Sequence, residues 1–517
     1  MNEFIEVWQP TSTLVSAFLP EIVLAVFALI VLALDVWCPK DRGNISTAAT
    51  YCGLLIAGCF TATAIAGAVS GDPAVCEASS RNIFGLSAFA EVLTVPFFLV
   101  CAFLTVFVGK VVRERTEFSA PITNHLILVA TAAAMALTKA SNFVAFFALL
   151  ETLTVSLYAL VGSYRTNVAS LEAGVKYLIA GGVSGGLMLF GIVLLYGATA
   201  LAGVGAGAGM DWLGYEAVAR MLAADPANPI ALVGAGMVLA GVMFKFGIFP
   251  MQFWIPDTYQ GAPLHVTFFL ATVSKAVGFI MMIILLMVFE PIFASLFPIL
   301  LILTLISMVY ANLAALGQRK VKRLLGLSGV SHASYMMLGI LAFLKIANDG
   351  VFDDAPSAEE PMAWAILLYM VFYVLSQYPI FSVMARVPAS AGDEAMQDFG
   401  DFRGLAKRSP VLAGAVASGL ASLAGIPPTV GFITKLGILW VVFYAGLYVP
   451  AAIMLACVVA SVYYYFAWIR SVFATDDGEI PADAPALLLP GIGARTSLVF
   501  FSALTVLGSL IYFAVIA

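Results

Sequence analysis

Apolar runs of about twenty residues recur along this chain, and they constrain its fold more than any other feature. A helix of that length crosses the hydrocarbon core of a bilayer, which is roughly 30 Å thick. Hydrophobic residues make up 62% of the 517 residues and charged residues only 10%, against about 25% charged in a soluble domain. A soluble fold could not bury so much apolar surface, so the sequence predicts an all-α polytopic membrane protein.

We expect about fourteen transmembrane helices. Their predicted positions are 17–36, 46–69, 86–109, 121–138, 142–162, 173–200, 229–249, 263–288, 292–316, 322–345, 362–386, 410–445, 447–470 and 495–516. The run at 410–445 exceeds the roughly 20 residues that one straight helix needs, which indicates a break within it. The start of the chain carries Glu3 and Glu6 and no early lysine or arginine, unlike a cleavable signal peptide, so we expect the first span to be retained.

Lysine and arginine residues predict the orientation of the spans, because they are enriched in the cytoplasmic loops of membrane proteins. The positive clusters follow odd-numbered spans: Lys40 and Arg42; Lys110, Arg113 and Arg115; Arg165; Arg319, Lys320, Lys322 and Arg323; Arg386, Arg403, Lys407 and Arg408; and Arg470. The even-numbered side carries acidic loops, for example at Asp353 and Asp354. This pattern predicts that both termini lie outside the cytoplasm.

The sequence argues against several other classes of site. The six cysteines are Cys38, Cys52, Cys59, Cys76, Cys101 and Cys457. None belongs to a C-x-x-C pair, which argues against an iron–sulfur cluster or a structural zinc site. The three histidines, His125, His265 and His332, lie far apart and do not indicate a haem or metal centre. The Gly-rich stretch at 203–209 follows a membrane span rather than a strand, so it predicts a loop and not a dinucleotide site. A basic stripe of the kind that binds nucleic acid is absent from the sequence.

Ionisable residues inside predicted spans are the main functional signal. A charged side chain at the centre of a membrane helix costs roughly 2.5–3.5 kcal/mol. The residues are Glu151, Glu172, Lys176, Lys245, Lys275, His332 and Lys435. Glu172 and Lys176 lie four residues apart on one helix face, so they fit a static pair as well as a functional one. His332 fits either a hydrogen-bonded core histidine or, beside Ser328, Ser331 and Tyr335, part of a proton wire.

Two predicted spans also contain breaks. Gly247-Ile248-Phe249-Pro250 interrupts the seventh span after Lys245, and Gly425-Ile426-Pro427-Pro428 interrupts the twelfth before Lys435. Proline removes a backbone donor, and non-helical backbone at membrane depth survives only inside protein or beside water. The two breaks are five spans apart, which predicts two inverted five-helix repeats. The predicted division is 1–120, 121–290, 291–472 and 473–517: three N-terminal helices, the two repeats, and a loop with the last helix.

These features together suggest proton movement. A carboxylate near a buried lysine favours the protonated lysine, and its withdrawal favours release of the proton. If Glu151 approached and left Lys245, then Lys245, Lys275, His332 and Lys435 could pass protons along a lateral chain with intervening water. None of these residues supplies electrons, so the driving force must come from a partner protein or an ion gradient.

Five stretches carry a family resemblance. They are FFALLETLTVSLYALVGSYR around Glu151, EAGVKYLIAGGVSGGLMLFGIVLLYG (172–197), FKFGIFPMQFWIPDTYQGAP (244–263), NLAALGQRKVKRLLGLSGVSHASYMMLG (312–339) and SLAGIPPTVGFITK (422–435). With LPEIVLAVFALIVLALDV at 19–36, they resemble the N subunits of the proton-pumping NADH–quinone oxidoreductase, respiratory complex I, an antiporter-like membrane subunit. PDTYQGAP resembles the signature of these subunits, whereas the sister antiporter-like subunits usually carry a histidine there.

The resemblance implies a role for each position. Glu151 matches the fifth-helix glutamate that pairs with the seventh-helix lysine, here Lys245. Lys275 matches the connecting lysine of the eighth helix, His332 the central histidine of the tenth, and Lys435 the exit-side lysine of the broken helix. Glu172 and Lys176 match a charged stretch of uncertain duty. The segment QFWIPD departs from the family, because a histidine common there is absent.

The resemblance also implies partners and alternatives. It implies a proton-translocating membrane-arm subunit in the bacterial inner membrane, with both termini periplasmic and no redox centre of its own. NADH, FMN, iron–sulfur clusters and quinone would be bound by partner subunits, and the neighbours would be the M subunit and the small K, J and A subunits. The alternatives are a cation/proton antiporter subunit, a ferredoxin-, F420- or hydrogenase-linked relative, and a scaffold whose charges move no protons. The loops at 70–85 and 349–361 look idiosyncratic.

Overall fold

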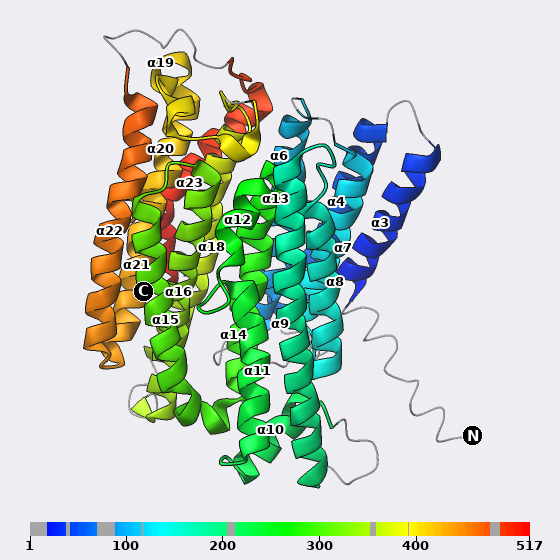
Figure 1. The fold of residues 1–517 in the computed structure, drawn as a ribbon, viewed down its shortest axis with the longest axis vertical. Coiled ribbons are helices and arrows are strands. Elements are labelled where there is room, and N and C mark those ends of the chain that lie inside the picture. The colour runs from blue at the N-terminus through cyan, green and yellow to red at the C-terminus, as the bar shows by residue number, and fades with distance from the viewer. Residues whose placement is uncertain are drawn as a thin grey trace.

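The computed structural model describes residues 18–37, 42–69, 88–114, 116, 118–203, 212–351, 358–390, 392–475 and 486–516. Within these ranges every regular secondary-structure element is a helix (Figure 1). The predicted loop at 70–85, most of the Gly-rich stretch, residues 352–357, Cys38, Cys76 and the first seventeen residues lie outside the described residues. The prediction of an all-α polytopic protein is confirmed.

The helices follow the order of the predicted spans. They are α3 (Leu19–Trp37), α4 (Arg42–Val69), α6 (Ala88–Arg113), α7 (Ala120–Thr138), α8 (Phe143–Val161), α9 (Val168–Leu201), α10 (Tyr215–Ala224), α11 (Pro229–Phe246), α12 (Trp254–Gly261), α13 (Leu264–Phe269), the π-helical η1 (Leu270–Ser274), α14 (Lys275–Val288), η2 (Glu290–Ile292), α15 (Phe293–Leu316), α16 (Val321–Asn348), α18 (Glu359–Met384), η4 (Glu394–Met396), η5 (Phe399–Phe402), α19 (Leu405–Arg408), α20 (Pro410–Ala424), α21 (Val430–Tyr444), α22 (Tyr448–Phe473) and α23 (Ile492–Ile516).

Thirteen helical segments of the described part are long and apolar enough to cross a membrane. One of them runs from Leu264 to Val288 and joins α13, η1 and α14. The predicted twelfth span is divided into the shorter apolar helices α20 and α21. The thirteen segments and this divided span correspond one by one to the fourteen predicted positions. The helices α10 and α12, which are too short to span a membrane, were not predicted from the sequence.

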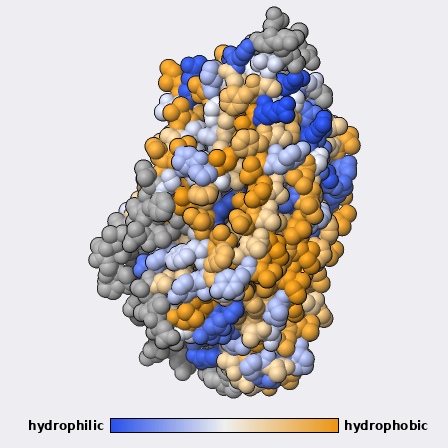
Figure 2. All heavy atoms as spheres, turned by 90° about the vertical axis from the view of Figure 1, so that its left-hand side faces the viewer, coloured by the Kyte–Doolittle hydropathy of each residue, from blue (hydrophilic) through white to orange (hydrophobic). Residues whose placement is uncertain are grey.

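Apolar side chains cover much of the outer surface, as expected of a protein whose solvent is lipid. Figure 2 shows them across the middle of one face, with hydrophilic side chains gathered mainly toward its two ends. On α22, for example, Val459 and Tyr463 are each 66% exposed. In contrast, the span from Leu264 to Val288 and α16 are buried within the bundle. These two central spans carry Lys275 and His332, so both residues are shielded from lipid.

Both predicted breaks exist and have the same local geometry. α11 ends at Gly247 and α20 ends at Gly425, with φ of +86° and +79°. Glycine adopts this left-handed conformation without the penalty that a Cβ would bring. The N–H groups of Gly247 and Ile248 both donate to the carbonyl oxygen of Met243, and the N–H groups of Gly425 and Ile426 both donate to that of Ala421.

The proline that follows each of these glycines completes the break. The peptide bonds Phe249–Pro250 and Pro427–Pro428 are both cis. Neither Pro250 nor Pro428 has an N–H with which to continue the helical ladder. The prediction of broken seventh and twelfth helices is therefore confirmed.

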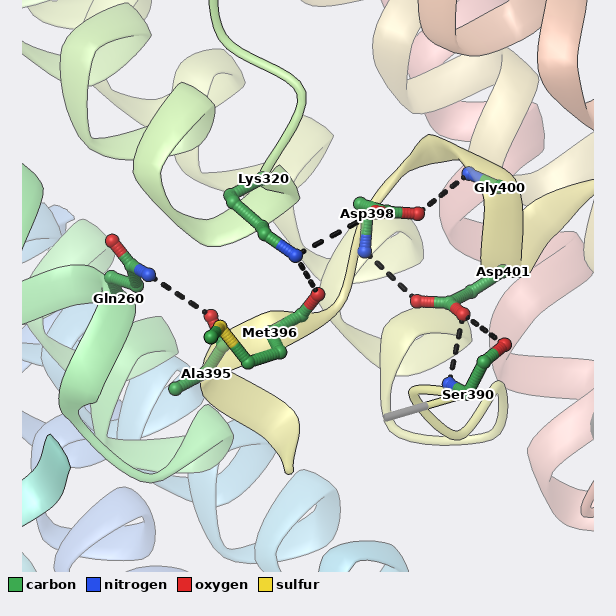
Figure 3. A network of polar contacts seen from close by, with 8 residues as sticks. All are labelled: Gln260, Lys320, Ser390, Ala395, Met396, Asp398, Gly400 and Asp401. Carbon is green, nitrogen blue, oxygen red and sulfur yellow. Dashed lines mark hydrogen bonds and ion pairs between the residues drawn. The ribbon is translucent and has the colours of Figure 1, made fainter. Parts of the chain in front are cut away.

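The segment 393–401, which we call the strap, crosses the α19 end of the bundle between α18 and α20 (Figure 1). Figure 3 shows its contacts with both halves of the chain. Gln260 Nε2 of α12 donates to the carbonyl oxygen of Ala395 at 3.3 Å, and Lys320 Nζ donates to that of Met396 at 2.6 Å. The strap is stiffened by its own Asp401, whose carboxylate accepts from the backbone N–H of Asp398. It therefore ties α12 to the start of α16.

Candidate functional site

Lys245 lies on the last turn of α11, directly before the break, and is 3% exposed. Its Nζ donates to Thr154 Oγ1 of α8 at 2.9 Å and to the Tyr177 hydroxyl of α9 at 3.2 Å. The same ammonium lies 5.7 Å from the centre of the Tyr177 ring. Two hydroxyls and an aromatic face thus replace the water that a buried ammonium loses.

Glu151 lies on the same face of α8 as Thr154 and is half-buried. The predicted ion pair between Glu151 and Lys245 is not a direct contact, since the Lys245 ammonium has Thr154 and Tyr177 as its partners. The Glu151 carboxylate instead lies against α9, where a Cβ at Gly185 would be 2.7 Å from its Oε1. The hydrogen bonds of Lys245 instead go to Thr154, three residues after Glu151 along α8, and to Tyr177.

Lys275 begins α14, directly after the π-helical turn η1, and is 2% exposed. Single π-helical turns occur frequently at functional sites. The Lys275 Nζ donates to the carbonyl oxygen of Gly329 in α16 at 2.8 Å. A Cβ at Gly247 would lie 3.7 Å from the same nitrogen. Lys275 is therefore next to the break in α11 on one side and next to α16 on the other.

His332 lies within α16 and is 4% exposed. Its Nδ1 is 2.8 Å from the Tyr369 hydroxyl of α18, and its Nε2 is 3.3 Å from the Tyr465 hydroxyl of α22. The Tyr465 hydroxyl also contacts Ser328 Oγ. The imidazole thus reaches the predicted serine only through a tyrosine that is 133 residues away in sequence.

The other predicted neighbours of His332 have different partners. Ser331 Oγ accepts from Asn312 Nδ2 of α15 at 2.8 Å, and the Tyr335 ring lies 5.7 Å from the Lys435 ammonium. The local hydroxyls therefore do not form a single wire around the histidine.

Lys435 lies within α21 and is 5% exposed. Its Nζ donates to the carbonyl oxygens of Leu423 at 2.7 Å and Ala424 at 3.0 Å, the last two residues of α20. The final carbonyl groups of a helix have no partner within it and carry the negative end of the helix dipole. The break in the twelfth span thus creates the site that holds this cation.

Contacts through α16 place Lys275, His332 and Lys435 one after another in a row of buried ionisable residues. Lys275 reaches Gly329, His332 follows three residues later, and the ring of Tyr335 faces the ammonium of Lys435. At the other side of Lys275, Gly247 is two residues after Lys245. Four buried ionisable groups therefore follow one another across the interior from α11 to α21.

Glu172 and Lys176 lie away from this row, at the surface. Their side chains are 60% and 47% exposed. Lys176 Nζ is 2.8 Å from Glu172 Oε1 and 2.9 Å from Asp257 Oδ2 of α12, and Arg323 Nη1 of α16 is 2.5 Å from Asp257 Oδ1. Burial opposes ionisation of Asp257, but the hydrogen bond from Lys176 and the charge of Arg323 outweigh it, so the pKa of this carboxyl is lowered. The arrangement is an ion-pair network that holds α12 between α9 and α16.

The described residues contain no group of three or more histidine, cysteine, aspartate or glutamate side chains placed to hold a metal ion. The row and the adjacent Glu151 together offer proton donors and acceptors: three ammonium groups, one imidazole, one carboxylate and several hydroxyls. Such groups transfer protons when they lie within hydrogen-bond reach, directly or through one water.

Comparisons with known proteins identify the family. The profile described as "NADH:quinone oxidoreductase/Mrp antiporter, TM" matches residues 140–462. NADH-quinone oxidoreductase subunit N 1 from Opitutus terrae is 41% identical over 476 residues, which cover 91% of this chain and 89% of that protein. This chain belongs to the subunit N family of NADH-quinone oxidoreductase.

Solved structures agree with this assignment. A chain of respiratory complex I from Thermus thermophilus with bound aureothin is 26% identical to this member of the subunit N family, with a TM-score of 0.71 over 96% of this chain and 99% of that one. A chain of the Mrp complex from Dietzia sp. DQ12-45-1b has a TM-score of 0.73 at 17% identity, over 97% and 95% of the two chains. The second likeness shows the shared fold alone.

Several residues of this subunit N family member were missed by sequence reasoning. They are Thr154, Tyr177, Tyr369 and Tyr465, which contact the row, and Asp257 and Arg323, which fix α12. Threonine and tyrosine are common in membrane spans and give no signal of their own. Asp257 did carry a signal, because it is the charged residue of the PDTYQGAP segment.

Proposed function

We propose that this chain is a proton-translocating membrane-arm subunit of an NADH:quinone oxidoreductase of the complex I type. Lys245, Lys275, His332 and Lys435 pass the protons, and Glu151 controls the charge on Lys245. The observation that carries the proposal is that these four groups are each at most 5% exposed and follow one another through contacts with α16 and the break in α11. Each of the three lysines costs roughly 2.5–3.5 kcal/mol to place at the centre of a membrane helix, and a chain in which they had no function would not be expected to keep them.

The contacts suggest how the transfer is controlled. Lys245 is held by hydroxyls rather than by a carboxylate, so small movements of Glu151 change its electrostatic environment without breaking an ion pair. When the Glu151 carboxylate moves away, Lys245 releases its proton toward Lys275, which lies beside Gly247. From Lys275 the proton reaches His332 and then Lys435, where the carbonyl groups at the end of α20 stabilise the charge. Water fills the gaps between these groups in the proposed pathway.

The proposal includes partners and placement. NADH, FMN, iron–sulfur clusters and quinone are bound by partner subunits, and quinone reduction there supplies the driving force. The neighbours are the antiporter-like M subunit and the small K, J and A subunits. The chain lies in the bacterial inner membrane with both termini on the periplasmic side. The matching geometry at Gly247 and Gly425 supports two inverted five-helix repeats, at 121–290 and 291–472, after N-terminal helices at 1–120 and before the last helix at 473–517.

Mass spectrometry of the complex that co-purifies with this chain in mild detergent tests the assignment. We expect peripheral flavin and iron–sulfur subunits together with an NADH-binding subunit. Recovery of only small hydrophobic partners would contradict the proposal and favour a cation/proton antiporter, which is then tested by sodium-dependent proton exchange. A ferredoxin-, F420- or hydrogenase-linked relative would be recognised by a different electron-input subunit in the same experiment.

Replacing Gly185 with alanine tests the role of the Glu151 carboxylate without removing it. The new Cβ would lie 2.7 Å from Glu151 Oε1, at the end of a flexible side chain, so we expect the carboxylate to move and the fold to remain. Misplacing a reacting group by about 1 Å can cost up to 100-fold in rate, and we expect proton pumping to fall at least threefold.

The matched control is Gly186→Ala, because a Cβ at Gly186 meets no atom within 4 Å. Both variants are measured as proton uptake by inverted membrane vesicles during NADH oxidation. Equal pumping by the two variants would show that the position of the Glu151 carboxylate is unimportant.

A further inference from the structure

A narrow pocket with a cavity volume of about 10 Å³ lies where α4, α6, α7 and α13 meet. Its lining includes Thr47 of α4, Lys110 and Arg113 of α6, Thr123 and Asn124 of α7, and His265 of α13. It lies at the α19 end of the bundle, where α6 ends and α7 begins (Figure 1). The residues that line it include two cations and no carboxylate. None of them belongs to the row that contains Lys245 and Lys275.

His265 forms the buried wall of this pocket and has no protein partner there. The side chain is 0% exposed, and neither ring nitrogen has a hydrogen-bond partner among the described residues. Its ring is stacked on Phe118 at 4.8 Å between centroids, and a Cβ at Gly109 would lie 3.5 Å from the imidazole. Buried polar groups in native proteins are nearly always hydrogen-bonded, so the unpaired imidazole indicates a ligand that donates or accepts inside the pocket.

The remaining features of the pocket favour a negative ligand. α7 begins here with Pro121 in its first turn, and the side chain of the N-cap Ser119 does not cap the helix, so the positive end of the helix dipole points at the pocket without a side-chain cap. Lys110 is exposed at the mouth of the pocket. Arg113 uses Nη2 to donate to Asn44 Oδ1 at 2.7 Å and retains other guanidinium donors.

We propose that this pocket binds the phosphate group of an anionic phospholipid. One phosphoryl oxygen enters the pocket toward His265 and Asn124, and the others stay at the mouth beside Lys110 and Arg113. The interior has room for little more than one oxygen-sized group, which fits an inserted oxygen and not a whole phosphate. The lipid is the source because the pocket lies at the ends of two membrane spans, the level at which headgroups lie and basic residues attract anionic lipids. The proposal does not depend on proton transfer by this chain.

Lipid retention by the intact complex tests this site. The complex is reconstituted into nanodiscs of phosphatidylcholine with or without phosphatidylglycerol, and the lipid that stays bound after release into detergent is quantified by native mass spectrometry. We expect the complex to retain phosphatidylglycerol in preference to phosphatidylcholine. The double variant Lys110→Ala/Arg113→Ala is expected to weaken this retention about tenfold, and His265→Leu is expected to weaken it separately.

Arg165→Ala is the matched control, because Arg165 is an exposed arginine between α8 and α9 that does not line the pocket. The double variant changes only side chains near the surface, so it remains informative if His265→Leu fails to assemble. Equal retention of phosphatidylglycerol by the wild type and the double variant would overturn the site. Displacement by millimolar inorganic phosphate without any preference among lipids would support a phosphate site but overturn the lipid as its source.

Discussion

Replacing Lys245 with alanine is expected to lower proton pumping at least tenfold while the complex still assembles. A positioned acid–base group typically contributes 100-fold or more to a proton transfer, and Lys245 is the group that joins the Glu151 side of the bundle to Lys275. Assembly should survive, because Thr154 Oγ1 keeps its bond to the carbonyl oxygen of Leu150 when the lysine is removed. The measurement is the proton-to-electron ratio in inverted vesicles, with the content of assembled complex measured in parallel.

Glu151→Ala is the companion variant, with a smaller expected loss because Glu151 acts on Lys245 without touching it. The control is Lys345→Ala, since Lys345 is a lysine near the end of α16 whose partner is the exposed Asp349 and not a member of the row. A normal proton-to-electron ratio in both Lys245→Ala and Glu151→Ala would contradict the proposed proton pathway. It would favour the alternative of a scaffold whose charges move no protons.

Replacing Gly431 with alanine is expected to have the largest effect on stability. Gly431 packs α21 against the end of α20 so closely that a Cβ would lie 1.8 Å from the carbonyl oxygen of Ser422. The backbone of α20 cannot move aside as easily as the end of a flexible side chain. Overpacking of this kind lowers the stability of the folded protein by about 1–3 kcal/mol or more. The displaced residues directly precede Leu423 and Ala424, whose carbonyl groups hold Lys435. Pumping should therefore fall together with stability.

Gly414→Ala supplies the comparison for this prediction, because a Cβ at Gly414 in α20 meets no atom within 4 Å. Alanine is a better helix former than glycine, so this control should be neutral or slightly stabilising. Both variants are followed by the temperature at which the chain is lost from the detergent-solubilised complex. If Gly431→Ala were as stable as the control, the two halves of the broken span could not be packed as closely as the structure describes.

The two breaks show that part of the fold is determined by short segments of the sequence. Gly-Ile-Phe-Pro at Gly247 and Gly-Ile-Pro-Pro at Gly425 end a helix through the conformational freedom of glycine and the missing N–H of proline. Both causes act within a few residues, so the sequence was sufficient to predict the breaks. The same holds for the fourteen spans, because the length and apolar character of a run decide whether it can cross a bilayer.

The contacts of the buried charges depend instead on how distant helices pack. The family resemblance implied that Glu151 pairs with Lys245, and only the structure shows that the hydrogen-bond partners of Lys245 are Thr154 and Tyr177. Lys176 lies within the span Val168–Leu201, as predicted, but only the structure shows that its ammonium lies at the surface beside Asp257, 81 residues away in sequence. Hydropathy does not record which face of a helix a neighbour covers.

The sequence alone therefore determined that this chain is a bundle of apolar spans, where two of them break, and which ionisable residues are retained within them. Each of these depends on the chemistry of a short stretch in lipid. Only the tertiary structure decided the partners: the Gly329 carbonyl for Lys275, Tyr369 and Tyr465 for His332, and the end of α20 for Lys435. The reason is physical, because a hydrogen bond requires two groups within about 3 Å, and only helix packing brings together groups that lie 12 to 133 residues apart along the chain.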